Sequence, residues 1–173
     1  EEVQNEEKRE ISSAQDRGSK QSVEGQTKQT TIELQSKGYK QGDQGKHIVK
    51  LKQDLTRLGF GNFPSTPSIY YGSITAGVVR DFQAYYKLEV TGAADAATLA
   101  KIEEILSSSY RSGESGDHIV QLKKDLTRLG FGNFPSSPSK AYGSVTEGVV
   151  RDFQAYYGLA VNGIADEVTL AKI

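Results

Sequence analysis

The sequence predicts an all-α protein built of two tandem small three-helix bundles, with short extended and loop segments and a low-complexity tail in front. Two observations lead to this fold class. The phrase "DLTRLGFGNFPS" occupies residues 54–65 and recurs letter for letter at residues 125–136. Within each copy, apolar residues recur at spacings of three and four, which is the period of a helix with one buried face.

The repeat defines the expected domains. It has a period of 71 residues and keeps its register from Tyr39, whose counterpart is Tyr110, as far as Ile173. We therefore expect a tail at residues 1–38, a first module at residues 39–109 and a second module at residues 110–173. The second module has no counterpart of residues 103–109, "EEILSSS", so it is truncated relative to the first.

The tail is rich in Glu, Gln, Lys and Ser. This composition is typical of a linker or a disordered segment, because it buries too little apolar surface to offset the loss of chain entropy. Within it, residues 30–36, "TTIELQS", alternate apolar and polar side chains. That stretch is compatible with a short strand or with the end of an earlier unit.

The first helix of each module is predicted from a single apolar stripe. In the first module, the stripe consists of Ile48, Leu51, Leu55 and Leu58. Gly59 follows at the place where a left-handed C-terminal cap favours glycine, so the helix is expected to end there. The next segment, "GNFPSTPSIYYG", contains two prolines and several serines and is expected to be an ordered loop.

The second helix is expected to begin at Ser73 and, in the second module, at Ser144. There "SVTE" reads as a Ser-x-x-Glu capping box that ends at Glu147. Ala76 stands at the matching place in the first module. We therefore expect a weaker cap on the second helix of the first module.

Two further boundaries complete the helices. Lys87 or Gly158 is expected to end the second helix. After a short extended stretch, the third helix is expected to be capped by Asp95 or Asp166, since an aspartate before a helix accepts hydrogen bonds from its first turn. Leu99 and Ile102 then face inward.

Bulk composition argues against several classes of function. The formal net charge is −1, and binding to nucleic acid by counterion release needs an excess of Lys and Arg that this chain does not have. No apolar run approaches the roughly 18 to 20 residues needed to cross a bilayer. The chain contains no Cys, and we expect no disulfide, no structural metal and no cofactor. The acidic start is unlike a signal peptide, so a signal for export would precede the first residue. A monomer is expected.

No catalytic constellation is found, and we expect a protein that is not an enzyme. His47 and His118 occupy the same helix-start position, one in each module, and lack the spacing of metal ligands. They are interpreted as partly exposed helix-terminal side chains. Asp81 and Asp152 each follow an arginine in mid-helix and are interpreted as part of a solvated charged face.

With these elements placed, the chain resembles the type 1 peptidoglycan-binding domain family, three-helix modules attached to bacterial and phage cell-wall hydrolases. The resemblance covers residues 39–102 and 110–173. It rests on "GDQGKHIVKLKQDLTRLGF", "YGSITAGVVRDFQAYYKLEVTG" and "ADAATLAKI". These carry Gly-x-x-Gly before the first helix, Gly-x-x-Thr before the second, a Phe-Gln pair within it, and Gly-x-x-Asp-x-x-Thr before the third.

The chain departs from the family pattern in two places. The loop at residues 61–71 is longer than the usual turn, and the Asp-Gly that commonly precedes Phe/Tyr-Gly is absent. A lengthened loop is where a recognition surface diverges, so the resemblance carries the fold more safely than the ligand preference.

The resemblance implies non-catalytic binding of peptidoglycan, through its glycan strand or its peptide stem, by a protein secreted to the cell wall or cell surface. Two weak sites on a polymer with many copies of one epitope gain avidity, by roughly 10²–10⁴, and would tether an attached enzyme or surface protein. The alternative is a protein–protein docking or assembly module that uses the same aromatic loop surface. The prodomains of secreted metalloproteases share the helical architecture, but their inhibition depends on a cysteine, which is absent here.

Two kinds of side chain are candidates for ligand contact. Aromatic rings around the proline-rich loop exceed what one helical face buries, and an exposed ring would stack on a sugar face or a peptide stem. Packing of these rings at the edge of the core is the open alternative. Arginine guanidinium groups match the carboxylate of a peptide stem. The candidate ligand-binding residues are Arg57, Phe63, Tyr71, Arg80 and Tyr86, with their counterparts Arg128, Phe134, Tyr142, Arg151 and Tyr157.

Overall fold

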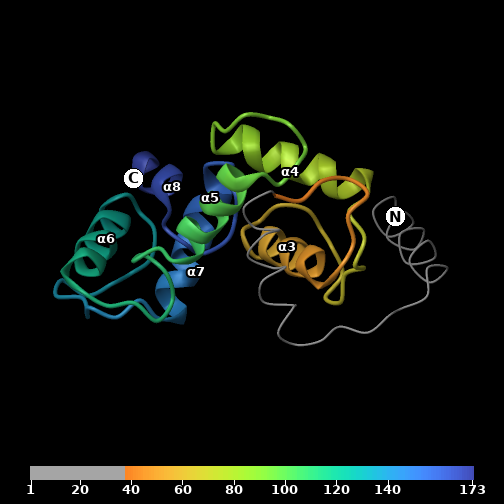
Figure 1. Cartoon of the computed structure of the whole chain (residues 1–173). Helices are drawn as coiled ribbons and strands as arrows, with labels where there is room; N and C mark the ends of the chain where they lie inside the picture. The colour runs from red at the N-terminus through yellow and green to blue at the C-terminus, as the bar shows by residue number, and fades with distance from the viewer. Residues whose placement is uncertain (1–37) are drawn as a thin grey trace. The chain divides into compact units, whose positions relative to one another are not determined.

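The computed structural model describes residues 38–173, so the predicted tail, apart from Gly38, lies outside the described residues (Figure 1). The described part contains six helices and no strand, which confirms the predicted fold class. No helix in it is long and apolar enough to span a bilayer. The helices are α3 (Lys46–Arg57), α4 (Ser73–Tyr85), α5 (Ala96–Leu106), α6 (Asp117–Arg128), α7 (Ser144–Tyr156) and α8 (Glu167–Lys172).

The chain divides into two compact units, and the division falls in the sequence between Ile102 and Glu103, within α5. We call the described residues up to Ile102 module 1 and the residues from Glu103 onward module 2. Each module contains one copy of the repeat, and each is described by itself.

The core of each module follows the apolar stripe of its first helix. In module 1, Ile48, Leu51 and Leu55 on α3 are buried, as predicted. In module 2, the core cluster consists of Ile119, Leu122, Leu126, Tyr142, Val150, Phe153 and Ala165. Burial of each large apolar side chain stabilises the module by about 1.5–3 kcal/mol, which is where most of the stability of so small a bundle originates.

The end of α3 has the glycine cap that the sequence predicts. Gly59 has a φ of 93°, the left-handed region that glycine occupies without strain. The Phe60 N–H donates to the Leu55 carbonyl at 2.8 Å, and the Gly59 N–H donates to the Thr56 carbonyl at 3.0 Å. These two bonds form a Schellman motif, which satisfies the last carbonyls of the helix and turns Phe60 back into the core.

The predicted capping box at the start of the second helix is wrong. The N-cap of α7 is Gly143, one residue before Ser144, and no side chain caps the helix. Ser144 is therefore the first helical residue, and Glu147 is one position too late to complete a box. The Glu147 carboxylate pairs instead with Arg151 at 3.0 Å, one turn further along α7.

The end of the second helix differs between the modules in one residue. Lys87 follows the C-cap of α4 with a φ of 59°, and Gly158 follows the C-cap of α7 with a φ of 66°. A residue with a Cβ has steric strain in this left-handed region, and glycine does not. The expected helix ends are confirmed, and module 1 carries backbone strain at Lys87.

We expect Lys87→Gly to stabilise module 1 by about 0.5–1 kcal/mol, because glycine relieves this strain at the cost of some chain entropy. Urea unfolding followed by amide NMR signals of each module measures the change. The matched control is Gly158→Lys, where an added Cβ meets no atom within 4 Å, so only backbone strain is introduced. It should destabilise module 2 by a similar amount, and a neutral result for both substitutions would contradict the prediction.

The third helix is capped as predicted. The Asp166 carboxylate accepts a hydrogen bond from the Thr169 N–H at 3.0 Å. In module 1, the Asp95 carboxylate accepts one from the Thr98 N–H at 2.9 Å. A capping role therefore accounts for both aspartates.

A buried glutamine joins the second helix to the segment before the third. In module 2, the Gln154 amide nitrogen donates to the Ile164 carbonyl at 2.9 Å and to the Thr169 hydroxyl oxygen at 3.0 Å. Its amide oxygen accepts from the N–H groups of Asn162 and Gly163, both at 3.0 Å. Gln83 makes the corresponding bonds in module 1. This network holds the third helix against the second.

Candidate functional site

The two tyrosines before the second helix lie in the core and not on the surface. The exposed fraction is 0% for Tyr71 and 1% for Tyr142. The Tyr71 hydroxyl donates to the Gly92 carbonyl at 2.5 Å, and the Tyr142 hydroxyl donates to the Gly163 carbonyl at 2.5 Å. Burial is the main cause that raises the pKa of both phenols above the usual value. These rings pack against protein, which is the arrangement the sequence left open as the alternative to ligand contact.

The other predicted rings differ between the modules. Phe63 and Tyr86 are buried in module 1. Their counterparts in module 2 are more accessible: Phe134 is half-buried and Tyr157 is exposed. Of the six predicted rings, the structure therefore places Phe134 and Tyr157 where a ligand can reach them.

The four predicted arginines are all exposed. Arg128 is held by Asp125 at 2.7 Å, and Arg151 is held by Glu147 at 3.0 Å. Arg57 stands at the last position of α3 and Arg80 within α4. All four side chains can meet an anionic group in solvent, although two of them would first have to exchange an acidic partner.

The two histidines lie beside tyrosine rings. The His47 ring is 4.7 Å from the Tyr39 ring, and the His118 ring is 4.9 Å from the Tyr110 ring. Burial lowers the pKa of His47, and Asp43 opposes this in part. Among the described residues, no group of three or more His, Cys, Asp or Glu side chains is arranged to hold a metal ion.

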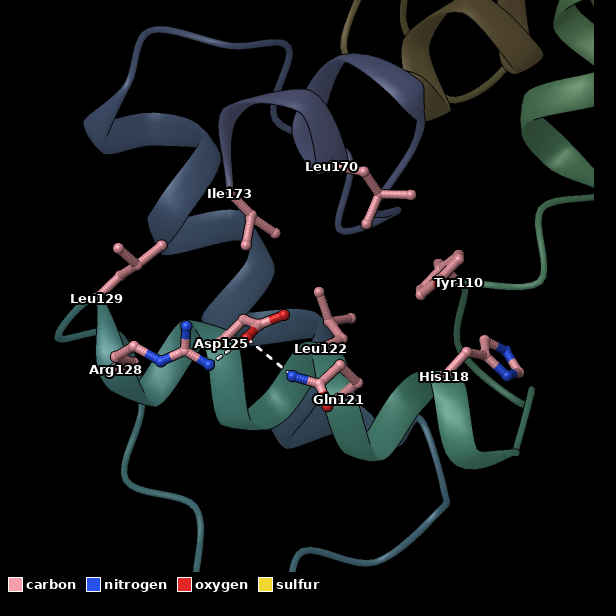
Figure 2. Close-up of a pocket in the computed structure, with 9 residues that line it drawn as sticks. All are labelled: Tyr110, His118, Gln121, Leu122, Asp125, Arg128, Leu129, Leu170 and Ile173. Carbon is pink, nitrogen blue, oxygen red and sulfur yellow. Dashed lines mark hydrogen bonds and ion pairs between the residues drawn. The ribbon is translucent and has the colours of Figure 1, made fainter.

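One hollow of module 2, of about 290 Å³, lies along α6 (Figure 2). Figure 2 shows Arg128, Gln121 and Asp125 along one edge, with dashed lines from both Arg128 and Gln121 to Asp125, and Leu170 and Ile173 on the opposite side. It is lined by Tyr110, His118, Gln121, Leu122, Asp125, Arg128, Leu129, Leu170 and Ile173.

One residue of this hollow differs in exposure between the modules. Leu129, which lines this hollow, has an exposed fraction of 42%, whereas its counterpart Leu58 has 0%. The two copies of the repeat differ in exposure at this position. We therefore do not place the shared binding surface there.

A second hollow of module 2, of about 370 Å³, lies between the proline-rich loop and the start of α7. We call it the Phe134 hollow. Its walls are largely apolar, and Phe134 is the residue in it that the sequence predicts as a ligand contact. It is lined by Lys123, Phe134, Pro135, Pro138, Ser139, Ala141, Gly143, Ser144, Val145 and Thr146.

Lys123 forms the charged floor of the Phe134 hollow, although its exposed fraction is only 4%. Its ammonium group donates to the Ser139 carbonyl at 2.8 Å, the Ser139 hydroxyl at 3.0 Å and the Ala141 carbonyl at 2.7 Å. It also lies 5.6 Å from the centre of the Phe134 ring. Burial lowers the pKa of Lys123, because it penalises the charged form.

The buried lysines, Lys52 in module 1 and Lys123 in module 2, are the residues that sequence reasoning missed. The sequence contains a pattern that indicates this burial. Lys52 follows Ile48 by four residues and precedes Leu55 by three, which places it on the buried face of α3. A lysine on such a face requires oxygen partners, and the proline-rich loop supplies them: the Lys52 ammonium donates to the Ser68 carbonyl at 3.2 Å.

The family described as "Putative peptidoglycan binding domain" matches residues 44–102 and again residues 115–173. These two matches cover more than half of the chain, and each falls on one copy of the repeat. The chain belongs to this family, as its sequence motifs predicted.

Three solved structures resemble parts of the chain. A peptidoglycan-binding protein from Clostridioides difficile, in complex with glutamine hydroxamate, is 32% identical, with 39% of this chain and 41% of that one covered and a TM-score of 0.35. A fused Zn-dependent amidase/peptidase/peptidoglycan-binding domain-containing protein from Clostridium acetobutylicum is 18% identical, with 60% and 48% covered and a TM-score of 0.36. A Burkholderia AP3 phage endolysin is 24% identical, with 57% and 41% covered and a TM-score of 0.35.

The chain spans less than half the length of each of these three structures. A comparison with curated proteins finds no significant match.

Proposed function

We propose that this chain binds peptidoglycan without catalysis, through both copies of its repeat, and tethers an attached enzyme or surface protein to the bacterial cell wall. The observation that carries this proposal is the pair of family matches, one on each module. The proposal implies that the protein works outside the cytoplasm, as a secreted protein.

Tandem modules suit a polymeric ligand. Peptidoglycan presents one epitope many times, so a second module binds at a high effective concentration once the first is bound. The gain in retention is roughly 10²–10⁴ without any new kind of contact. Avidity therefore gives a physical reason for the duplication.

The exposed arginines are the ligand contacts we propose to be common to both modules. Arg57 and Arg128 end the first helix of their respective modules, and both are exposed. A guanidinium group there can pair with a stem-peptide carboxylate through two parallel hydrogen bonds. Arg80 and Arg151, on the second helix, remain proposed contacts on the same argument.

Sedimentation of the full chain with purified insoluble peptidoglycan tests this function. We expect the chain to sediment with the polymer and the double variant Arg57→Ala plus Arg128→Ala to bind about tenfold or more weakly, since each charge-assisted pair contributes about 1.5 kcal/mol or more. The matched control is Lys87→Ala plus Lys124→Ala, which removes two exposed cations elsewhere. Retained binding by the arginine variant, or an equal loss in the lysine control, would contradict these contacts.

Failure of the unmodified chain to sediment would overturn the proposed function. That result would favour the protein–protein docking alternative, in which the accessible side chains of module 2 bind a polypeptide. Tyr156 and Val145, which are strongly exposed apolar side chains of α7, would then be the first positions to test.

A further inference from the structure

The Phe134 hollow contains a buried cation with no acidic partner. No carboxylate lies within ion-pair distance of the Lys123 ammonium in the part of the chain that the structure describes. Its hydrogen bonds go to two carbonyls and one hydroxyl, which satisfy its donors but leave its charge uncompensated. A buried charge is stable when an opposite charge compensates it, so this floor favours an anion in the hollow.

The start of α7 adds hydrogen-bond donors beside this cation. The first residues of a helix have N–H groups without partners inside the helix, and no side chain caps α7. Ser144, Val145 and Thr146, which supply these N–H groups, all line the hollow. They can bind a carboxylate, and the helix dipole favours negative charge at this end.

Thr146 supplies an independent sign of a ligand. Its exposed fraction is 2%, and its hydroxyl has no hydrogen-bond partner among the described residues. In module 1, the hydroxyl of its counterpart Thr75 is likewise buried without a partner. The Thr146 hydroxyl is not among the fully buried unpartnered atoms, so in module 2 a ligand oxygen in the hollow can pair with it.

The residues that line the hollow differ from their counterparts in module 1 at two positions, Ala141 and Val145. The loops at residues 61–72 and 132–143 differ at three positions, and of these only Ala141 lines the hollow. Tyr70 stands at that position in module 1. Phe63, the counterpart of Phe134, is buried in module 1.

We propose that the Phe134 hollow is a binding site for the carboxylate end of a short peptide with small apolar side chains. The carboxylate lies against the α7 N–H groups and the Thr146 hydroxyl, with the Lys123 charge beneath it. The apolar side chains contact Phe134, Pro138 and Val145. The identification of this peptide with the alanine end of the peptidoglycan stem rests on the proposed function.

Size and charge agree with this ligand. A hollow of about 370 Å³ lies at the small end of ligand pockets and suits one or two small residues. The nearby acid Glu147 is engaged by Arg151 at 3.0 Å, which reduces its repulsion of a bound carboxylate. Because the Lys123 donors are already matched, Lys123 acts through its charge and not through a new hydrogen bond.

An NMR titration of the full chain with N-acetyl-D-alanyl-D-alanine tests the site. We expect the largest shifts at the amides of Ser144, Val145 and Thr146. The matched ligand is the same dipeptide with a carboxamide end, which should bind about tenfold more weakly or worse because it has no charge to pair. Equal binding of both dipeptides, or shifts scattered over exposed lysines and arginines, would overturn the proposal.

Two substitutions probe the site without threatening the fold. Ala141→Tyr copies the residue of module 1 and should abolish the shifts in module 2 by filling the hollow. Thr146→Val removes the hydroxyl at nearly constant volume and should weaken binding several-fold while leaving the module folded. The reciprocal change Tyr70→Ala should open a second site in module 1, with new shifts at Ser73 and Ile74. Unchanged binding by the Ala141→Tyr variant would place the ligand elsewhere.

The outcomes separate this inference from the proposed function. If the chain sediments with peptidoglycan but the dipeptide shifts no amide of the hollow, the carboxylate site is wrong while wall binding stands. If the dipeptide binds in the hollow but the chain does not sediment, the carboxylate site stands and the ligand is a peptide from another source.

Discussion

Gln154→Ala is expected to lower the free energy of unfolding of module 2 by about 3–5 kcal/mol, the largest effect of any substitution that leaves the apolar core intact. The side chain is fully buried. It bonds to backbone groups of Asn162, Gly163 and Ile164 and to the side chain of Thr169. Alanine supplies none of these bonds and leaves several buried polar groups without partners.

The size of the effect follows from what remains after the substitution. Each buried polar group that loses its partner costs about 1–3 kcal/mol, and the Asn162 and Gly163 N–H groups both point at the missing amide oxygen. A module of this size has little stability in reserve. We therefore expect the third helix to detach and the module to unfold at room temperature or slightly above it.

Chemical denaturation of the full chain, followed by amide signals of each module, measures the loss. The matched control is Gln121→Ala on α6, an exposed glutamine whose amide donates to Asp125 at 3.0 Å. That control should change stability by less than about 0.5 kcal/mol. A loss below about 1 kcal/mol for Gln154→Ala would show that water replaces the bonds of the amide.

Tyr142→Ala is expected to destabilise module 2 by about 3–5 kcal/mol, and Tyr71→Ala to do the same in module 1. Both rings are buried, and both hydroxyls donate to the carbonyl of the glycine that also donates to the buried glutamine. Removing a ring leaves a large cavity and an unpaired carbonyl. Loss of wall binding in these alanine variants would therefore report unfolding and not the loss of a ligand contact.

Tyr142→Phe separates the hydroxyl from the ring. It should cost about 1–2 kcal/mol, because the Gly163 carbonyl loses its donor while the core stays filled. The exposed neighbour Tyr156 is the control, and Tyr156→Phe should be nearly neutral. A Tyr142→Ala variant that unfolds no more easily than the phenylalanine variant would contradict the core assignment.

The buried tyrosines also predict alkaline instability. Burial is the main cause that raises the pKa of Tyr142 and Tyr71 in the folded state above the usual value of about 10. A raised pKa means that the folded state holds its proton more tightly than the unfolded state. The contribution of the protonated tyrosines to the free energy of unfolding is therefore complete below about pH 10, and it is lost as the pH rises above that value. The double variant Tyr71→Phe plus Tyr142→Phe should lose less stability over that range.

Local signals in the sequence predicted most of the backbone. The stripe of Ile48, Leu51 and Leu55 predicts a helix because its period matches the helical turn, and these side chains are buried. Gly59 and Asp166 cap their helices as expected, because caps depend on residues that are neighbours in the chain. The Ser144 cap was misplaced by one residue, since Gly143 takes the extended conformation that an N-cap needs.

The candidate site was less predictable, because exposure is decided by residues that are distant in the chain. Tyr142 lies in the loop before the second helix, where a side chain is expected to be exposed. Its hydroxyl instead donates to the carbonyl of Gly163, which is 21 residues away in the sequence. The spacing of Lys123 places it on the buried face of α6, but the loop oxygens that bind its ammonium group are 16 and 18 residues away in the sequence. Neither of these contacts can be predicted from the spacing of residues along the chain.

By itself, the sequence determined the family, the duplication and the three helices of each module, because motifs and helical periodicity are properties of neighbouring residues. The tertiary structure alone decided which rings remain accessible and where module 2 is hollow. The physical reason is packing, because a side chain is buried only where other side chains lie over it. Position 70 in module 1 is tyrosine and the matching position 141 in module 2 is alanine, which is the largest change in side-chain volume between two otherwise similar loops.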